Sequence, residues 1–290
     1  MKVAIYGQNY KNEALEYLDV LLDHLKLEQI EVVIEKQFYD LLDSDKTLNT
    51  FSNHHDLDAS FNLMFTIGGD GTFLRAITYV RDLNIPIIGI NTGRLGFLAT
   101  IQKEHIKSAI DALIEKKYSI KERSLLQVRT SAQNRYLEDL NFALNEVTVA
   151  RRNTTSMITV ETYLNEEYLT SYWADGLIVS TPTGSTGYSL SCGGPVITPQ
   201  AKSFVLTPIA PHNLNARPLV IPDDTSIKLK ITGREKQALI SLDSRITVVD
   251  NESEVFIKKA PFTLKIIQLH DQTFLKTLRA KLLWGEDKRN

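Results

Sequence analysis

The first segment whose residue types suggest chemistry is the run Gly-Gly-Asp-Gly-Thr at residues 68–72, which follows an apolar stretch and precedes a helical pattern. Glycines there let backbone N–H groups approach phosphate oxygens closely, and a helix start adds positive dipole character. Asp70 is an anion within this predicted phosphate site. We therefore expect it to accept a proton from an attacking hydroxyl or to help hold a divalent cation. A tight turn in which Asp70 only caps the helix is the competing interpretation.

The second segment runs from Trp173 to Ser191, where a short apolar strand pattern is flanked by Asp175 and by a run of small hydroxyl and glycine residues. Such a run is too polar for a core and too short for a flexible linker. It suits close contact with a ligand rich in hydroxyls and amides. Tyr188 could hydrogen-bond to that ligand or stack on a ring. A long surface loop is the alternative interpretation.

A third segment, residues 91–98, follows the next predicted strand, so it belongs to the same sheet edge as residues 68–72. Arg94 could meet a phosphate there, and an ordinary strand–helix loop is the alternative. Several familiar motifs are absent: the sequence has no P-loop, no dinucleotide fingerprint and no paired His/Cys spacing typical of zinc sites. Cys192 is the single cysteine, which excludes an intramolecular disulfide. We assign no residue as a metal ligand.

The first 120 residues alternate strand and helix patterns, which predicts a parallel sheet with helices on both faces. The predicted strands are residues 3–6, 30–34, 62–67 and 85–90, and the predicted helices are residues 13–27, 72–81 and 103–116. Residues 40–60 are polar and are expected to form a helix fragment and a loop.

From about residue 123 onward short strands follow one another, which predicts an all-β domain such as a sandwich. The predicted strands are residues 125–130, 143–149, 157–163, 168–173, 177–180, 227–231, 239–242 and 262–269, with a hairpin turn at residues 165–167. Residues 273–283 have a helical pattern. We therefore expect an α/β domain at 1–122, an all-β domain at 123–270, and a C-terminal helix within 271–290 that returns to the first domain.

Charge and composition limit the class of protein. The chain of 290 residues carries 33 Lys and Arg against 35 Asp and Glu, for a formal net charge of −2. This balance argues against a broadly basic nucleic-acid-binding protein. Residues 1–7 do not have the pattern of a signal peptide, and no long apolar run predicts a membrane helix. We expect a cytoplasmic protein with no nucleic-acid or membrane partner.

The motifs together resemble those of the NAD kinase family, in order and over nearly the whole chain. The resemblance rests on Gly-Gly-Asp-Gly at 68–71, Asn145-Glu146, the segment 175–191, Gly-Gly-Pro at 193–195, Pro211-His212 and Arg-Pro-Leu at 217–219. The first motif alone also resembles diacylglycerol, sphingosine and phosphofructo-kinases, whereas the segment 175–191 is specific.

The resemblance implies an activity and a fold. Members of this family transfer the γ-phosphate of ATP to the 2′-hydroxyl of the adenosine ribose of NAD, which gives NADP. Some members also use GTP or inorganic polyphosphate. They require a divalent cation, usually magnesium, and form homodimers or homotetramers through the β-domain. A Rossmann-like N-terminal domain and an all-β C-terminal domain are implied, in agreement with the division above.

The resemblance also implies residue roles. Asp70 resembles the catalytic aspartate that takes the 2′-hydroxyl proton, a role that a positioned carboxylate can fill for a hydroxyl of high pKa. Asn145 and Glu146 resemble the pair that holds adenine and ribose, and Asp175 resembles the carboxylate that bonds to an amide or amino group of NAD. The remaining expected nucleotide-binding residues are Gly68, Gly69, Gly71, Arg75, Thr186, Gly187, Tyr188, Ser189, Leu190 and Ser191.

Three positions vary within the family and limit the comparison. Trp173 lies where some members carry Arg, Arg245 where others carry Gln or His, and Ser156 where some carry His. We expect Trp173 and Arg245 to contact the nucleotide and these positions to tune the choice between NAD and NADH, with NAD preferred.

Two other functions are compatible with parts of the pattern. A lipid kinase could share the glycine turn, but the second half carries a polar Thr/Ser/Gly run instead of an apolar acyl groove. A catalytically silent NADP(H) sensor could share the fold, but Asp70 is intact.

Overall fold

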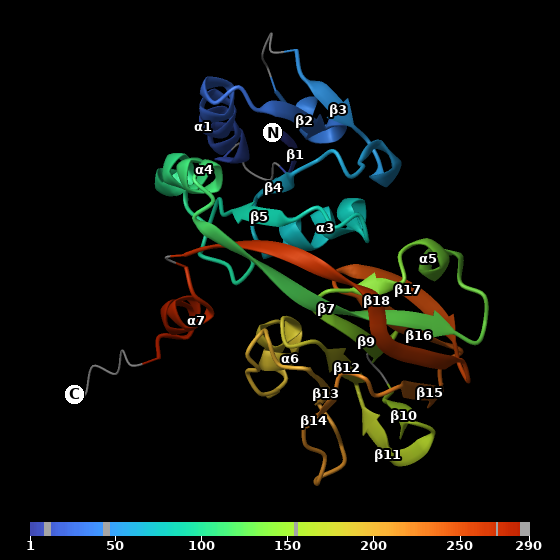
Figure 1. Cartoon of the computed structure of the whole chain (residues 1–290). Helices are drawn as coiled ribbons and strands as arrows, with labels where there is room; N and C mark the ends of the chain where they lie inside the picture. Colours follow the sequence, from blue (N-terminus) through green and yellow to red (C-terminus); the bar gives the residue numbers. More distant parts are fainter. Residues whose placement is uncertain (9–12, 43–46, 154–155, 271, 285–290) are drawn as a thin grey trace. The chain divides into compact units, whose positions relative to one another are not determined.

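The computed structural model describes residues 1–8, 13–42, 47–153, 156–270 and 272–284 (Figure 1). The chain forms two compact units: unit 1 comprises residues 1–122 and 264–290, and unit 2 comprises residues 123–263. Residues 264–270, which the sequence analysis included in the second domain, belong to unit 1 because Ile266 pairs with Ile87. Residues 271 and 285–290 of the expected C-terminal segment lie outside the described residues.

Unit 1 is an α/β domain around a parallel sheet. Its strands are β1 (Lys2–Gly7), β2 (Glu31–Glu35), β3 (Asn49–Phe51), β4 (Leu63–Ile67), β5 (Ile87–Ile90) and β6 (Ala99–Ile101). They are ordered β3-β2-β1-β4-β5, and every pair is parallel, as predicted. β5 also pairs in parallel with β6 and with the end of β18 (Glu254–Leu269).

Helices bury apolar stripes against this sheet. The α-helices are α1 (Glu13–Leu27), α2 (Lys36–Tyr39), α3 (Asp70–Val80), α4 (Ile106–Ile114) and α7 (Phe274–Leu282), and the short 3-10 helices are η1 (His54–Asp56) and η2 (Lys103–His105). In α1, Leu18, Leu21 and Leu25 are completely buried and join Val3 and Ile5 of β1 in one core. The helical spacing of leucines therefore predicted α1 correctly, because that stripe faces the sheet.

The main departure in unit 1 is the region 40–60. The structure has β3 and η1 there, where a helix fragment and a loop were expected, and residues 43–46 lie outside the described residues. β3 has only three residues and pairs with β2 through its backbone, from Val33 with Asn49 to Glu35 with Phe51. A strand this short has no periodicity for a sequence pattern to detect.

Unit 2 is a sandwich of two antiparallel sheets. One sheet contains β7 (Tyr118–Thr130), β8 (Phe142–Ala143), β10 (Ile158–Leu164), β11 (Glu167–Ala174), β15 (Ile227–Gly233) and part of β18. The other has the order β14-β13-β12-β9-β16-β17, formed by Leu219–Pro222, Ser203–Ile209, Gly176–Ser180, Glu146–Arg151, Gln237–Leu242 and Arg245–Asp250. The connections hold α5 (Arg135–Asp139), η3 (Gly184–Thr186) and α6 (Tyr188–Ser191).

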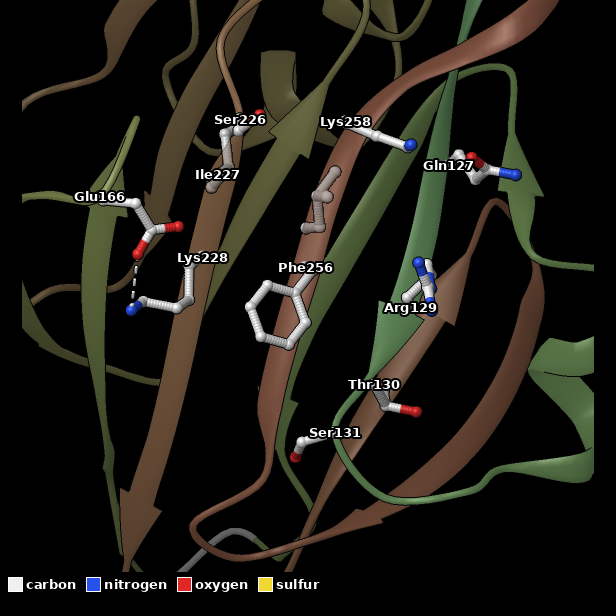
Figure 2. A pocket seen from close by; sticks show the side chains of 11 residues that line it. Gln127, Arg129, Thr130, Ser131, Glu166, Ser226, Ile227, Lys228, Phe256 and Lys258 are labelled. Carbon is white, nitrogen blue, oxygen red and sulfur yellow. Dashed lines mark hydrogen bonds and ion pairs between the residues drawn. The ribbon is translucent and has the colours of Figure 1, made fainter.

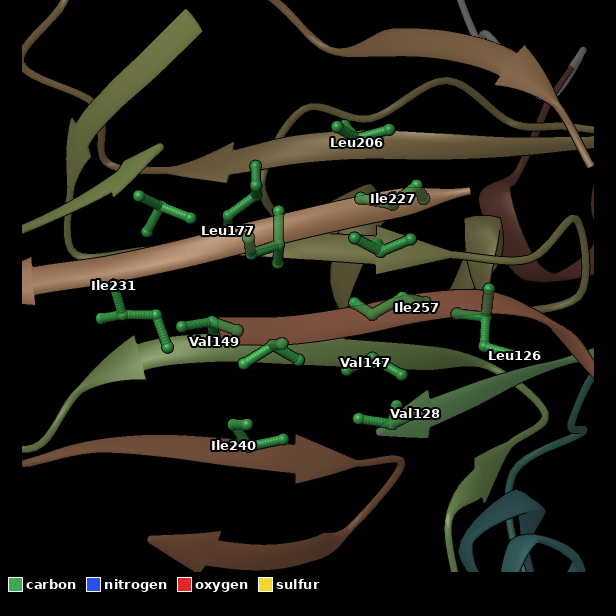
Figure 3. Close-up of a cluster of buried hydrophobic side chains, with 14 of the residues drawn as sticks. Leu126, Val128, Val147, Val149, Leu177, Leu206, Ile227, Ile231, Ile240 and Ile257 are labelled. Carbon is green, nitrogen blue, oxygen red and sulfur yellow. The ribbon is translucent and has the colours of Figure 1, made fainter. Parts of the chain in front are cut away.

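Alternate residues of both sheets fill the space between them. Figure 3 shows this core, in which side chains from β7, β9, β12, β13, β15, β16 and β18 interdigitate. The alternation that buries them is the pattern from which the all-β domain was predicted. β13, β14 and β17 were not predicted. β13 and β14 each contain a proline, which weakens a strand signal, although β14 tolerates it at a sheet edge. No helix of the described residues is long and apolar enough to cross a membrane.

Candidate active site

The glycine turn at the end of β4 has the backbone that a phosphate site needs. Gly68 has φ +149°, and a Cβ there would lie 2.2 Å from Thr72 Oγ1, so this position requires glycine. Gly69 is the residue before the first turn of α3, and both Gly69 and Gly71 are exposed with open space where a Cβ would be. The first N–H groups of a helix lack intrahelical partners. The turn therefore offers open backbone donors at the start of α3.

Asp70 is the first residue of α3, and its carboxylate is held by another segment. Oδ2 accepts a hydrogen bond from the Phe97 N–H at 2.8 Å, and Oδ1 accepts from the Leu98 and Ala99 N–H groups, each at 3.0 Å. Asp70 therefore does not act simply as a cap for its own helix, which was the competing interpretation. The two segments that follow β4 and β5 meet at this carboxylate, as expected for neighbouring parallel strands.

Among the described residues, the side chains of Arg75 and Arg94 form no hydrogen bond or ion pair with the Asp70 carboxylate. Arg75 is exposed on α3, about one helical turn beyond Gly71, and Arg94 is exposed in the segment after β5. Neither has a hydrogen bond or ion pair that fixes its guanidinium in the described residues. Both are free to move toward an anionic ligand.

In unit 2, Asn145 and Glu146 lie at the start of β9 beside the turn between η3 and α6. Asn145 Oδ1 and Glu146 Oε2 are buried and have no hydrogen-bond partner among the described residues. A Cβ on Gly187 would lie 3.0 Å from Glu146 Oε2, so this buried oxygen lies directly against the turn. Buried polar atoms without partners are costly, and a bound polar ligand is one way to satisfy them.

The Glu146 carboxyl has an unusual proton affinity. Burial, followed by the nearby charge of Asp243, raises the pKa of Glu146 to about 8, although a hydrogen bond from the Tyr188 N–H opposes the shift. At neutral pH this side chain is mainly a neutral carboxylic acid. It can then donate one hydrogen bond as well as accept others, for example with a ribose hydroxyl or a ring nitrogen.

Asp243 is the residue of this region that sequence reasoning missed. Its buried carboxylate accepts hydrogen bonds from the N–H groups of Leu144 at 3.1 Å, Asn145 at 2.7 Å and Glu146 at 3.3 Å. Its own N–H donates to the Glu146 carbonyl at 2.9 Å. Asp243 thereby fixes the backbone that presents Asn145 and Glu146. The sequence predicted the strand at residues 239–242 but not β17 after it, and no sequence signal shows what the turn between them holds.

Asp175 has a partner that was also missed. Arg151 Nη2 lies 3.0 Å from Asp175 Oδ2, and both side chains are about one-quarter exposed. Tyr188 is near this pair. Its pKa is raised mainly by burial, and nearby charges that include those of Asp175 and Glu146 add to that shift. Asp175, Tyr188, Glu146 and Asn145 therefore lie in one region of unit 2, and their role in holding a ligand stays a prediction.

The segment 186–191 is only partly available to a ligand. It forms the end of η3 and the short helix α6, with Tyr188 and Ser191 exposed and with Thr186, Gly187 and Leu190 half-buried. Ser189 is completely buried, and its hydroxyl bonds with Thr207 Oγ1 at 2.8 Å. The expectation that this whole run faces the ligand therefore does not describe Ser189. Its hydroxyl also lies against Gly194, since a Cβ on Gly194 would lie 2.1 Å from Ser189 Oγ.

The three positions that vary within the family do not all lie in the same place in the structure. Arg245 is mostly buried, and its guanidinium donates to the carbonyls of Leu140 and Phe142, so in this structure it braces the backbone instead of pointing to solvent. Trp173 is half-exposed and its ring lies 4.7 Å from the ring of His212. Trp173 and Ser156 line one cavity of about 420 Å³. These two positions could therefore act on the same part of a ligand.

A second cavity of unit 2, of about 520 Å³, involves other strands. It is lined by residues of β7, β15 and β18, including Arg129, Phe256 and Lys258, as Figure 2 shows. One of its lysines, Lys228, is paired with Glu166 at 3.1 Å. Arg129 and Lys258 are exposed, Lys228 is half-buried, and none of the polar residues that line the cavity is buried, so we assign no ligand to it.

A metal ion would have few protein ligands here. In the part of the chain that the structure describes, no three His, Cys, Asp or Glu side chains are grouped so that they could hold a metal ion. A hard cation such as Mg²⁺ commonly takes one or two carboxylates and fills its other positions with substrate phosphates and water. Asp70 beside the glycine turn fits that limited role.

Comparisons with known proteins show the family to which the chain belongs. The models of the ATP-NAD kinase N-terminal and C-terminal domains match residues 3–118 and 144–269. The NAD kinase of Flavobacterium psychrophilum is 59% identical over 294 residues, with both chains covered completely. The NAD kinase of Cytophaga hutchinsonii is 46% identical, again over all of both chains.

Solved structures show the same fold. Yeast NADH kinase complexed with NADH superposes with a TM-score of 0.90 at 21% identity, and the match covers 100% of this chain and 89% of that chain. An NAD kinase from Archaeoglobus fulgidus in complex with ATP gives a TM-score of 0.75 at 26% identity, with 97% and 99% covered. The fold and the sequence matches define a phosphotransferase with an N-terminal and a C-terminal kinase-family domain. The chain belongs to the ATP-NAD kinase family.

Proposed function

We propose that this protein transfers the γ-phosphoryl group of ATP to the 2′-hydroxyl of the adenosine ribose of NAD, with Asp70 as the general base. Family membership supports the reaction, and the similar enzymes solved with NADH and with ATP support the two substrates. The single observation that carries the role of Asp70 is its position: a partly exposed carboxylate beside an open glycine turn at the start of α3.

The chemistry assigns a task to each group. A ribose hydroxyl has a high pKa, so a positioned carboxylate that accepts its proton accelerates attack by about 10²–10⁴-fold. Phosphoryl transfer otherwise depends on positioning and on neutralising the charge of the phosphoryl oxygens. The N–H groups around Gly69 and Gly71 supply donors for phosphate oxygens. A divalent cation, for which we propose magnesium, supplies further charge neutralisation when bound.

Residues of unit 2 are proposed to bind the nucleotide of NAD. Asn145 and the neutral carboxyl of Glu146 hold adenine and ribose through the buried oxygens that lack partners in the described protein. Asp175 and Tyr188 bind the remaining amide or amino groups. Trp173 contributes its exposed ring and tunes the choice between NAD and NADH.

The decisive experiment compares the wild-type protein with Asp70→Asn. Purified protein is incubated with NAD, ATP and magnesium, and NADP is measured with an NADP-specific dehydrogenase. We expect robust ATP-dependent NADP formation by the wild type and a decrease in kcat of about 10²–10⁴-fold in Asp70→Asn. NADP formation by Asp70→Asn at the parental rate would show that Asp70 is not the base.

The proposal also covers the cellular location, the oligomeric state and the need for a divalent cation. We propose that the protein is cytoplasmic. We also propose a homodimer or homotetramer, because large apolar side chains are exposed on unit 2: Tyr168, Trp173, Leu214 and Val220. Sedimentation equilibrium distinguishes these states. Removal of divalent cations with EDTA should abolish activity, and addition of Mg²⁺ should restore it. Failure of the wild type with ATP, polyphosphate, Mg²⁺ and Mn²⁺ would favour an NADP(H)-binding sensor.

A further inference from the structure

The three hydrogen bonds to Asp70 come from consecutive backbone N–H groups. Phe97, Leu98 and Ala99 are the last residues of the segment that connects β5 to β6 and the first residue of β6 itself. Backbone donors cannot rotate away as side chains do. Two of them occupy Asp70 Oδ1 and one occupies Oδ2, so Oδ2 keeps one more lone pair open than Oδ1 among the described bonds. The arrangement fixes the plane of the carboxylate and leaves Oδ2 as the oxygen that can take a proton.

Gly96 makes room for this carboxylate. A Cβ at this position would lie 2.0 Å from Asp70 Oδ1 and 2.7 Å from its Cγ. The backbone of Gly96 does not have the positive φ that restricts a position to glycine. The requirement for glycine at residue 96 therefore comes mainly from the Asp70 side chain, with the Ala99 carbonyl oxygen as a more distant neighbour at 3.0 Å.

The Asn91 side chain joins the beginning of this loop to its end. The buried Asn91 side chain donates from Nδ2 to the Ala99 carbonyl at 3.1 Å and accepts at Oδ1 from the Gly93 N–H at 2.7 Å. The Gly96 N–H also donates to the Ala99 carbonyl at 3.2 Å. These bonds hold the three donor N–H groups in one fixed loop.

The C-terminal helix contacts the outer side of the same loop. The rings of Phe97 and Phe274 are 6.2 Å apart, and Lys281 Nζ lies 5.8 Å from the centre of the Phe97 ring. Gln272, two residues before α7 begins, bonds with Thr100 Oγ1 at 2.5 Å. Helix α7 therefore contacts the residue that donates to Asp70 Oδ2, and Gln272 just before the helix bonds to the strand that follows.

We propose that residues 96–99 are a positioning segment for the Asp70 carboxylate, and that α7 stabilises this segment through Phe274. The inference rests on the proposed role of Asp70 as the base. As the new bond between the ribose 2′-oxygen and the γ-phosphorus forms, the bond to the leaving oxygen of ADP breaks and the hydroxyl proton moves to Asp70 Oδ2. The segment sets the direction of that oxygen and contacts no reacting atom.

The first test compares Gly96→Ala with the matched control Gly93→Ala. Both add one methyl group to the same loop, but a Cβ on Gly93 meets nothing within 4 Å. We expect Gly96→Ala to lower kcat by about 10²-fold, with the KM values for ATP and NAD within about threefold of wild type, because a displaced base affects the chemical step. Gly93→Ala should keep kcat within about twofold. Equal kcat values for the two variants would overturn the proposal.

A double-mutant cycle separates positioning from general damage to the fold. In an Asp70→Ala background the added methyl group at residue 96 has no carboxylate to displace, so Gly96→Ala should lower the residual kcat by less than about threefold. A full loss in that background would assign Gly96 a merely structural role and overturn the proposal. If Asp70→Ala itself retains parental activity, the proposed role of Asp70 as the base fails instead, so the two failures are distinguishable.

The role of α7 is tested with neighbouring residues of that helix. Phe274→Ala removes the ring that faces Phe97, whereas Leu275→Ala changes a residue that is 58% exposed. We expect Phe274→Ala to lower kcat by about five- to tenfold without a matching change in KM, and Phe274→Tyr to restore it, while Leu275→Ala stays within about twofold. Equal kcat for Phe274→Ala and Leu275→Ala would remove α7 from the proposal.

Discussion

Two carboxylates, one in each unit, are held in the same way, by three consecutive backbone N–H groups. Asp70 of unit 1 accepts hydrogen bonds from residues 97–99, and Asp243 of unit 2 accepts them from residues 144–146. Their surroundings differ, since Asp70 is a partly exposed residue whereas the side chain of Asp243 is only 1% exposed. Three N–H donors can thus fix a carboxylate in either setting. Exposure decides whether that carboxylate is available to a substrate or serves to hold the chain.

The buried carboxylate has an electrostatic consequence that the exposed one lacks. Burial raises the pKa of Asp243, although Arg245 and the three N–H donors oppose the shift. Asp243 also contributes to the raised pKa of Glu146, after burial. A group held for structural reasons therefore also sets the protonation state of a proposed ligand-binding residue.

The largest expected effect follows from the loss of the Asp70 carboxylate in unit 1, and it is an effect on catalysis. Asp70→Ala should lower kcat by about 10²–10⁴-fold. It should lower the free energy of unfolding less than Asp243→Ala does, because the carboxylate that it removes belongs to a partly exposed residue. Kinetics and urea unfolding of the same preparation measure both. A loss of several kcal/mol on unfolding would mean that Asp70 is as structural as Asp243.

Asp243→Ala, in contrast to Asp70→Ala, should have its main effect on the stability of the fold. It leaves three buried N–H groups without an acceptor, so we expect the free energy of unfolding to decrease by about 2–4 kcal/mol. Urea unfolding measures the change. Asp250→Ala is the matched control, since Asp250 is an exposed carboxylate on the adjacent strand β17. Similar losses in the two variants would contradict the role assigned to burial.

The raised pKa of Glu146 predicts a pH dependence of stability. The ordinary pKa is 4.5 and the folded value is about 8. Between these values the folded protein keeps a proton that the unfolded chain releases, so this group makes stability fall as pH rises from about 4.5 to 8. Glu146→Gln removes that dependence.

We expect the stability of Glu146→Gln relative to wild type to increase by about 1–4 kcal/mol between pH 5 and pH 8.5. Urea unfolding of both proteins at each pH gives this difference. A difference that stays constant with pH would show that Glu146 is ionised in the folded protein at neutral pH.

The smallest expected effect concerns the pair of Arg151 and Asp175. Both side chains are partly exposed, so Arg151→Ala should lower the free energy of unfolding by less than about 1 kcal/mol. If Asp175 binds NAD, its loss of orientation should raise the KM for NAD more than it changes kcat. Arg152→Ala, which changes the next and exposed arginine, is the control. An equal KM for NAD in both variants would separate Asp175 from the nucleotide.

Patterns with a strong local signal were predictable from the sequence. The leucine spacing of α1, the buried runs β4 and β5 and the alternating strands β10, β15 and β16 all agree with the structure. The glycine turn before Asp70 was also identified, since glycine and a following helix mark it locally. Short elements such as β3 and the proline-containing β14 were missed, because backbone pairing with distant strands stabilises them.

The sequence by itself determined the residue types and their local geometry: an acid after a glycine turn, an Asn-Glu pair at a strand start, and a polar run of small residues. Only the tertiary structure decided which N–H groups reach Asp70, that Asp243 lies behind Asn145 and Glu146, and that Ser189 faces the interior while Tyr188 does not. The physical reason is sequence distance. Asp70 and its donors are 27–29 residues apart, and Asp243 and its donors are 97–99 apart. No local periodicity encodes contacts over such separations.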